Sequence, residues 1–409
     1  MKKIIALLGL CLINSAFAAL DPVIEESLYL KYQESILSKN HHKNAMVGFT
    51  HLEQEIFVDA VETLALENSP EALVALENIN TITFGVVEDL RVSILRLKYE
   101  TQTSLPEALV NELTTLLLDR EVDVKLIYTL AAYEKILIKA GASNIIELAK
   151  RHPQYSDVSD DDDFRQTLSD DIFSDLVYKN PDVTDYMNGE YVNSVKIFMF
   201  CRENRLYPCL MVMKDVHGQL VREANGKLWT HPALASSKQG LPSYSRNGNT
   251  PTGVLTIDSV MPAADQVTSF GKYRRMILNW VPKSKDEVLM LSLLPESSKS
   301  KDWWKEAQVS RDIGRNYLRI HGSGKLNPDP KTPYFPFNRT SGCISQRENT
   351  YNGVTYKDQR EILDSVMVAM NLKPVFANEL AVKGILYVTE INDIQEPVSL
   401  EALNQLGIE

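Results

Sequence analysis

The residue types best suited to nucleophilic chemistry in this chain are a cysteine and a histidine in its second half. Cys343 follows a glycine in the stretch Arg339-Thr-Ser-Gly-Cys343-Ile344, and His321 ends the apolar, strand-like run 317–320. A free thiol with an ordinary pKa of about 8.5 is only slightly ionised at neutral pH, so a catalytic cysteine needs a neighbouring imidazole. The glycine before Cys343 also lets backbone N–H groups point at a reacting carbonyl, as an oxyanion hole requires.

Residues 1–18 are typical of a secretory signal peptide. Met1-Lys2-Lys3 supplies a positive start, an apolar stretch follows at 4–13, and Ala16-Phe17-Ala18 is a small-x-small cleavage pattern. A retained membrane anchor is the alternative, although the apolar stretch is short for a bilayer. We expect a mature chain in the periplasm or cell envelope, with no membrane span after cleavage.

Cysteine usage supports the nucleophile hypothesis. Cleavage after residue 18 would remove Cys11 and leave three cysteines. Cys201 and Cys209 flank a turn between two apolar runs, so they could face each other across a hairpin, either as a disulfide or as two buried thiols. Cys343 is left over in both cases. Alone, Cys343 is better explained as a buried structural thiol and His321 as a core histidine, but together in an exported protein they favour a catalytic pair.

The elements that must position this pair belong to a mostly-β domain, expected over 191–395, with 396–409 as a C-terminal tail. Two apolar runs, Val195–Phe200 and Leu210–Met213, are predicted to form a hairpin. The other expected elements are strands at Leu255–Val260, Arg275–Val281, Val288–Leu294, Tyr317–Ile320 and Ile385–Ile391, and a helix at Asp358–Met370.

Residues 19–151 are predicted to form an all-helical domain, which makes the chain an α+β multidomain protein. Ser104-Leu-Pro-Glu107 is a capping box, and leucines follow it at helical spacing. The string Pro-Glu-Ala-Leu-Val at 70–74 recurs at 106–110. A repeat of about 35 residues indicates an α-solenoid, but chance similarity between amphipathic helices is an equal alternative.

The aspartate-rich segment 152–190 is predicted to be a solvated linker, because it lacks the ligand intervals and glycine of a calcium loop. The whole chain carries 43 basic and 54 acidic residues, for a net charge of -11. That balance argues against nucleic acid as a partner and against electrostatic docking on an anionic membrane. Apart from His41-His42 the mature chain has no closely spaced His/Cys set, so we expect no catalytic zinc and no other cofactor.

Three stretches together resemble the signature of L,D-transpeptidase (YkuD-like) catalytic domains. They are Thr250-Pro-Thr-Gly253, Ile320-His321-Gly322 and Thr340-Ser-Gly-Cys343-Ile344, and the resemblance covers roughly residues 192–392. It implies that Cys343 attacks the L,D bond between the third and fourth residues of a peptidoglycan stem peptide, with His321 as its base. The acyl group would then pass to an amine, which is transpeptidation, or to water, which is carboxypeptidation.

The resemblance also implies roles for neighbouring residues. Gly342 and the Cys343 N–H would form the oxyanion hole beside Ser341, and either Gly322 or Ser323 would orient the imidazole. A substrate carboxylate could be held near Thr340 by bidentate contact with Arg339 or Arg347. Alternatively, these two arginines could be plain surface residues.

The chain departs from the family pattern near the nucleophile. Ser341 stands where the family usually has His, Ser345 stands where Arg or Asn is common, and an insert occupies 328–336. These departures put in doubt the acyl acceptor and the way the substrate carboxylate is held. Two alternatives to an enzyme are a degenerate domain that binds wall peptides without turnover, and a helical domain that recruits a protein partner.

Overall fold

The computed structural model describes the β domain almost completely and the helical region in part. The predicted signal peptide, the recurrence at 106–110, His41-His42 and nearly all of the predicted linker lie outside the described residues. The described residues are 34–39, 48–66, 68–79, 88–101, 183, 187, 193–243, 246–264, 266–281, 287–301, 303–312, 315–316 and 318–408.

The β domain is built on one mixed sheet of eight strands in the order β3-β2-β1-β10-β4-β5-β6-β7. Two pairs, β1 with β10 and β6 with β7, are parallel, and the remaining pairs are antiparallel. With the helices around it, this sheet confirms the expected mixture of α and β structure. The strands are β1 (Lys196–Arg202), β2 (Cys209–Lys214), β3 (Thr230–Ala233), β4 (Gly253–Val260), β5 (Met276–Trp280), β6 (Arg319–His321), β7 (Ile344–Ser345) and β10 (Gly384–Asn392), with a separate hairpin of β8 (Glu348–Tyr351) and β9 (Val354–Lys357).

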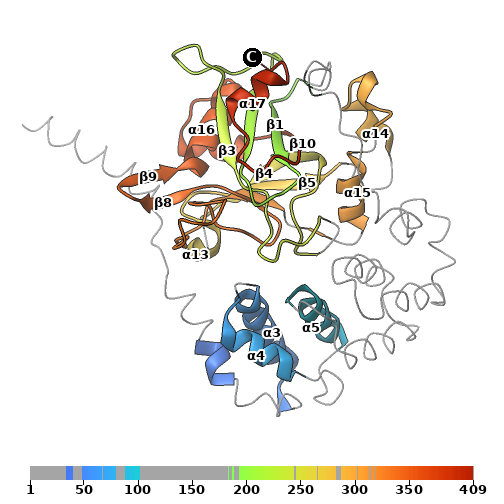
Figure 1. Ribbon diagram of the computed structural model, residues 1–409, viewed down its shortest axis with the longest axis vertical. Coiled ribbons are helices and arrows are strands. Elements are labelled where there is room, and N and C mark those ends of the chain that lie inside the picture. The colour runs from blue at the N-terminus through green and yellow to red at the C-terminus, as the bar shows by residue number, and fades with distance from the viewer. Residues whose placement is uncertain are drawn as a thin grey trace, which may run out of the picture.

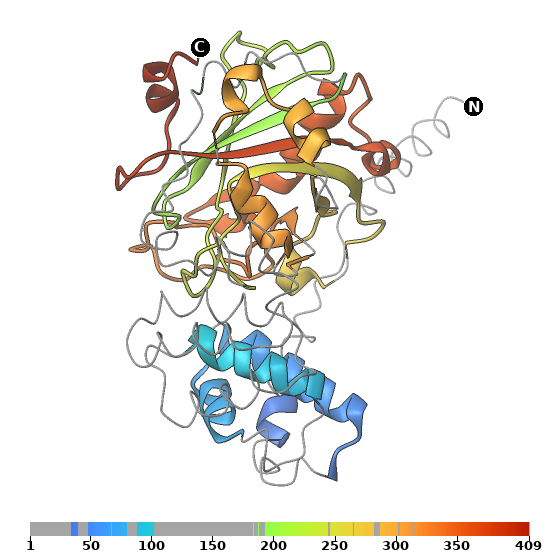
Figure 2. The same cartoon turned by 90° about the vertical axis from the view of Figure 1, so that its right-hand side faces the viewer.

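The two ends of the sheet meet, so that it is nearly a barrel (Figures 1 and 2). Just after β3, the Leu234 N–H donates to the Ser345 carbonyl at 3.0 Å, and the Ser345 N–H donates back at 2.8 Å. Ser345 belongs to β7, the strand that follows Cys343. Cys343 therefore leads into a strand that is hydrogen-bonded on both sides.

Both faces of the sheet are buried, which explains its continuous apolar strands. In β1, Ile197 and Met199 belong to the core cluster inside the sheet, whereas Phe198 and Phe200 belong to the cluster on its outer face. Full burial of such a side chain contributes about 1.5–3 kcal/mol. The covering helical segments are α13 (Val267–Phe270), α14 (Glu287–Ser292), η2 (Glu296–Ser298), α15 (Lys305–Asp312), α16 (Asp358–Ala369), η3 (Phe376–Ala381) and α17 (Leu400–Gln405).

The predicted hairpin is confirmed as the antiparallel pair β1–β2, and a disulfide between Cys201 and Cys209 joins its two strands. The expected strands at 255–260, 275–281, 317–320 and 385–391 correspond to β4, β5, β6 and β10, and the predicted helix corresponds to α16. Because Cys201 and Cys209 are bonded to each other, the alternative of two free thiols at the hairpin is excluded.

The strand predicted at Val288–Leu294 is wrong, because this run forms helix α14 and the turn after it. Met290, Leu293 and Leu294 are buried at helical spacing, whereas Val288 and Leu289 are exposed. The run is rich in Leu and Met, which favour helices, and a short apolar run carries no period that separates helix from strand.

The segments on either side of the expected β domain also pack against it. The expected C-terminal tail contains α17, whose Leu403 is fully buried in the outer core cluster. Met187, near the end of the predicted linker, is buried in the same cluster, and its carbonyl accepts a hydrogen bond from Lys214. The β domain is therefore stabilised by residues outside the predicted boundaries.

The described N-terminal residues are helical, in agreement with the sequence. Their main helices are α3 (His51–Ala65), α4 (Pro70–Asn78) and α5 (Glu88–Thr101). Thr50 and Glu53 form a capping box at the start of α3, and Ser69 caps α4 with Pro70 in its first turn. All three helices share one apolar core. The proposed solenoid repeat depends on residues beyond those described and stays a prediction.

In both views of Figures 1 and 2, α3, α4 and α5 lie at one end of the β domain and the C-terminus lies at the other. Gln239 links the two parts, because its amide donates to the Leu66 carbonyl at 3.3 Å and to Asn68 Oδ1 at 3.2 Å. Within the described part of the chain, no helix has both the length and the apolar character needed to cross a bilayer.

Candidate active site

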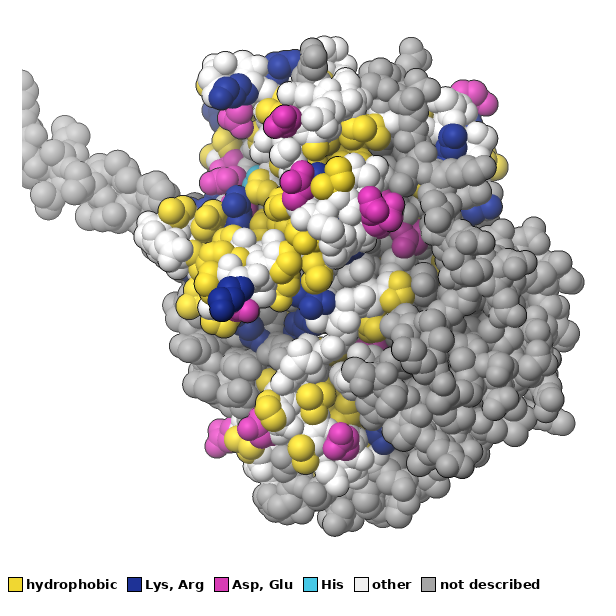
Figure 3. Space-filling view, viewed as in Figure 1, with side chains coloured by type: hydrophobic (Ala, Val, Ile, Leu, Met, Phe, Trp, Pro, Cys, Tyr) yellow, Lys and Arg dark blue, Asp and Glu magenta, His cyan; other side chains and the backbone are white. Residues whose placement is uncertain are grey.

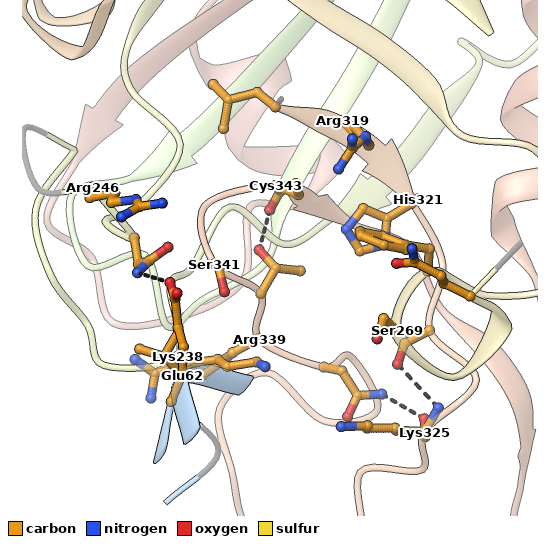
Figure 4. A pocket seen from close by; sticks show the side chains of 18 of the residues that line it. Glu62, Lys238, Arg246, Ser269, Arg319, His321, Lys325, Arg339, Ser341 and Cys343 are labelled. Carbon is orange, nitrogen blue, oxygen red and sulfur yellow. Dashed lines mark hydrogen bonds between the residues drawn. The ribbon is translucent and has the colours of Figure 1, made fainter. Parts of the chain in front are cut away.

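Cys343 and His321 are brought together by the parallel pairing of β6 with β7. Ile320 pairs with Ile344, and His321 pairs with Ser345. Cys343, one residue before β7, therefore lies beside Arg319, and side chains at these alternate positions share one face of the sheet. Figure 4 shows Arg319 and His321 next to each other, with Cys343 beside them on the neighbouring segment. The predicted pair thus lines one cavity.

The loop before Cys343 is fixed by hydrogen bonds from threonines. The Thr340 hydroxyl donates to the Cys343 carbonyl at 2.6 Å, and the Thr250 hydroxyl donates to the Gly342 carbonyl at 2.9 Å. Gly342 has a φ of 106°, and a Cβ there would lie 2.3 Å from Arg315 Nη2. Only glycine fits this conformation and this approach without strain.

The Thr250-Pro-Thr-Gly253 stretch has a structural role in the site. Thr252 is held by Glu306 of α15, whose Oε2 accepts from the Thr252 N–H at 2.5 Å and from its hydroxyl at 2.6 Å. A Cβ at Gly253 would lie 2.6 Å from Cβ of Ala307, so α15 packs directly on the turn. The turn thereby connects α15 to the Cys343 loop through Thr250.

The His321 ring is oriented by the next residue's carbonyl. Nδ1 of His321 lies 2.5 Å from the Gly322 carbonyl oxygen, and a carbonyl can only accept. Nδ1 therefore carries the proton, and Nε2 is the basic nitrogen of the neutral ring. Of the two predicted orienting residues, Gly322 has this role. Ser323 is 6% exposed and instead accepts from the Lys325 N–H at 3.2 Å.

A buried carboxyl group supports the His321–Gly322 peptide from behind. Glu348, at the start of β8, is 3% exposed, and its Oε2 accepts from the Lys272 N–H at 2.8 Å. A Cβ at Gly322 would lie 2.0 Å from its Oε1, and one at Gly271 would lie 2.6 Å away. Burial raises the pKa of Glu348 to about 8, despite the opposing Lys272 hydrogen bond and charge. This carboxyl group therefore carries a proton at neutral pH.

Both members of the predicted pair are uncharged at neutral pH. Burial lowers the pKa of His321 to about 4, opposed by the Gly322 hydrogen bond and reinforced by the charge of Arg275. Burial also raises the pKa of Cys343, although the Arg319 charge and a backbone hydrogen bond from Arg319 lower it. A neutral thiol and a neutral imidazole therefore line the same cavity.

Aromatic and cationic groups missed by the sequence analysis surround this pair. The Phe270 ring contacts the His321 ring edge-on at 4.9 Å between centroids. The guanidinium groups of Arg275 and Arg319 lie 4.2 and 5.2 Å from the Phe270 centroid. Alternation of Arg319 with His321 along β6 was the one sequence signal for this cluster, whereas the role of Phe270 depends on tertiary contacts.

The pair opens into a cavity of about 780 Å³, a size suited to a small peptide. Of the predicted site residues, Ser341, Thr340, Arg339 and Ser323 also line it. Figure 4 shows Ser341 and Arg339 on the same side of the pocket, below Cys343. Tyr334, from the predicted insert, belongs to the lining as well, and Arg339 lies 5.8 Å from the centre of its ring.

Two predicted roles do not agree with the geometry. The Arg347 Nε forms an ion pair with Asp358 Oδ2 at 2.6 Å, and the residue is not part of the cavity lining, so a substrate contact through Arg347 is not supported. The Gly342 N–H, assigned to an oxyanion hole, donates to the Thr340 hydroxyl at 3.2 Å. Small polar side chains often accept from the N–H two residues on, and this bond competes with an oxyanion.

The described residues contain no group of three His, Cys, Asp or Glu side chains that could hold a metal ion. Comparisons of the chain with protein-family models, with curated proteins and with solved structures gave no match. The functional argument therefore depends on the site itself. That site combines a glycine-presented thiol, a tautomerically fixed imidazole and a peptide-sized cavity.

Proposed function

We propose that this chain is an exported L,D-transpeptidase that acts on peptidoglycan stem peptides through Cys343. The observation that carries the proposal is the pairing of β6 with β7, which places His321 and Cys343 in one cavity with the Nδ1–H of His321 bonded to Gly322. Three sequence motifs that resemble this family meet at that point. Export is inferred from residues 1–18.

In the first half-reaction the Cys343 thiol proton passes to Nε2 of His321 as sulfur attacks the carbonyl of the L,D bond. A new C–S bond forms, the C–N bond breaks, and the departing D-amino acid takes the proton from His321. The guanidinium charges that lower the pKa of Cys343, those of Arg319, Arg315 and Arg275, stabilise the negative charge that develops on sulfur.

In the second half-reaction an amine attacks the thioester, a C–N bond replaces the C–S bond, and the thiol is regenerated. Water is the alternative acceptor and would make the protein an L,D-carboxypeptidase. Ser341 favours a contribution from water, because it lines the cavity at a position where the family has an imidazole, and a serine hydroxyl cannot shuttle a proton to or from an amine.

The full chain, incubated with tetrapeptide muropeptides and analysed by mass spectrometry, tests this proposal. We expect cross-linked or trimmed product, and at least a hundredfold loss in Cys343→Ala and in His321→Ala. The double variant should lose little more, because the two groups share one step. His217→Ala is the matched control, since His217 is exposed and is not part of the cavity lining.

A domain that binds wall peptides without turnover is the competing function. Covalent labelling by a carbapenem separates the two, because the β-lactam carbonyl is attacked by the same thiol. A mass shift in the full chain that disappears in Cys343→Ala supports an enzyme. Binding of muropeptides with neither labelling nor product would refute the proposed activity.

A further inference from the structure

The cavity around Cys343 is completed by the N-terminal helical region. Asp59, Glu62 and Leu66 of α3 and its following turn line the same cavity as Cys343. Asp59 and Glu62 are three residues apart and therefore share one face of the helix. The opposite face of α3 packs in the helical core through Phe57, Val61 and Leu64.

Hydrogen bonds hold α3 against the β domain at this point. The amide of Asn247 donates to Glu62 Oε1 at 3.4 Å and to Glu100 Oε2 of α5 at 2.6 Å. Gln239 makes the second connection, to the turn after α3. Figure 4 shows Glu62 reaching from the ribbon of α3 toward the side of the pocket that carries Arg246 and Ser341.

The two walls of the cavity carry opposite charges. The β-domain wall includes the cations Lys238, Arg246, Arg315, Arg319, Lys325 and Arg339, and the α3 wall includes the carboxylates Asp59 and Glu62. In Figure 3, Lys and Arg side chains gather at the edge of the β domain that faces the helices. Among the described residues, no ion pair within 4.0 Å joins Asp59 or Glu62 to Arg246 or Arg339.

Two further observations concern the groups that a ligand would meet in this cavity. Burial raises the pKa of Asp59, the neighbouring Glu62 and Glu55 raise it further, and the charge of Arg246 lowers it, so Asp59 interacts with charges of both walls. His321 is 3% exposed and lines the cavity, and its Nε2 has no hydrogen-bond partner among the described residues. A substrate can therefore contact the basic nitrogen and the acidic wall from one cavity.

We propose that α3 forms the acceptor side of the active site, and that Asp59 and Glu62 select an acyl acceptor that carries an ammonium group besides its attacking amine. The carboxylates of the acyl donor would lie toward the cationic wall. This inference rests on the proposed function, because it assigns the second substrate of the same reaction. It makes the helical region a determinant of specificity, in place of a separate scaffold.

Two acceptors that differ in one charge provide the test. D-Lysine carries a side-chain ammonium, and D-norleucine lacks it. We expect the full chain to transfer its acyl group to D-lysine with a kcat/KM about tenfold higher, the effect of one charge-assisted contact. In Asp59→Asn/Glu62→Gln this ratio should fall toward one. Glu77→Gln, which removes an exposed charge from α4 outside the cavity, should keep the original ratio.

Binding of the same two amino acids to the Cys343→Ala full chain, followed by NMR titration, separates this inference from the proposed function. A preference for D-lysine that disappears in the Asp59→Asn/Glu62→Gln background supports the α3 assignment, even if Cys343 is never acylated. No preference, or an equal loss for both acceptors, overturns it, even if acylation occurs. The assignment is also overturned if Asp59→Asn/Glu62→Gln is acylated faster by a carbapenem while its preference for D-lysine over D-norleucine is unchanged. That result would mean that α3 hinders entry of the acyl donor and does not select the acceptor.

Discussion

The Oε1 atom of Glu348 lies 2.0 Å from the position that a Cβ atom would take at Gly322. Because the Gly322 carbonyl accepts from Nδ1 of His321, this close approach links a buried carboxyl group to the orientation of His321, the proposed base. Glu348 touches the peptide behind His321, so in the proposed reaction it would act as a positioning residue.

The first prediction is that Gly322→Ala displaces either Glu348 or the His321 peptide. We expect a loss of about 1–3 kcal/mol in the free energy of unfolding, as for overpacked cores, and at least a tenfold lower turnover. Denaturant unfolding and muropeptide turnover measure the two effects. Gly48→Ala, where a Cβ meets nothing within 4 Å, is the control. Full activity in Gly322→Ala would show that the carbonyl tolerates the shift.

The second prediction concerns pH and stability. The pKa of Glu348 is raised to about 8 in the folded chain from an ordinary value of 4.5, so the folded state keeps a proton that the unfolded state has lost. Its contribution to stability is complete below pH 4.5 and is lost as the pH rises through about 8. Between pH 5 and pH 8.5, the free energy of unfolding should therefore decrease more for the wild type than for Glu348→Gln. Parallel curves would contradict the assignment.

The third prediction is the acid limb of the rate profile. His321 accepts a proton only when its ring is neutral, and burial lowers its pKa to about 4. The value of kcat/KM should therefore hold down to about pH 5 and decline near pH 4, instead of near an ordinary histidine value of about 6.5. Carbapenem acylation rates across pH 3.5–8 provide the measurement. A half-point near 6.5 would mean that the imidazole is solvated in solution.

The fourth prediction separates strain from crowding at the nucleophile loop. Gly342→Ala forces a side chain onto a φ of 106° and places its Cβ 2.6 Å from the Gly248 carbonyl. We expect a loss of about 1–3 kcal/mol in stability together with loss of acylation. Gly353→Ala, with a φ of 81° and open space around it, should show only the backbone cost and keep its acylation. Equal behaviour of the two variants would exclude the crowding effect.

The fifth prediction concerns the fate of the acyl group. An imidazole at position 341 can exchange protons with an attacking amine, which the native serine cannot do. Ser341→His should therefore raise the ratio of cross-linked to trimmed product, with carbapenem acylation compared in parallel. Mass spectrometry of both products gives the ratio. If the substitution abolishes acylation, the site is built around Ser341 and the family comparison does not extend to this position.

The sequence identified the parts of the site that local chemistry specifies. Cys343, His321 and Gly342 could be named because a thiol, an imidazole and a turn glycine have recognisable neighbours along the chain. Glu348 could not, since an isolated glutamate in a strand carries no sign that two glycines from other segments enclose its carboxyl group. Asp59 could not either, because only the docking of α3 brings it to the cavity.

The same contrast holds for the fold. β1 and β2 were predictable because a turn joins two long apolar runs, and α16 because its apolar positions recur at helical spacing. α14 was mistaken for a strand because its apolar run is too short to show a period. The pairing of β6 with β7 connects two strands of three and two residues, and their length gives almost no propensity signal.

The position of the disulfide determines how the chain would oxidise if it is exported and cleaved as proposed. Cys201 and Cys209 are separated by 8 residues, whereas each is more than a hundred residues from Cys343. Closing the short loop costs roughly 2–3 kcal/mol less in chain entropy than closing either long one. The two hairpin cysteines therefore find each other first in an oxidising compartment. The third sulfur is left reduced and reaches the finished sheet as a thiol.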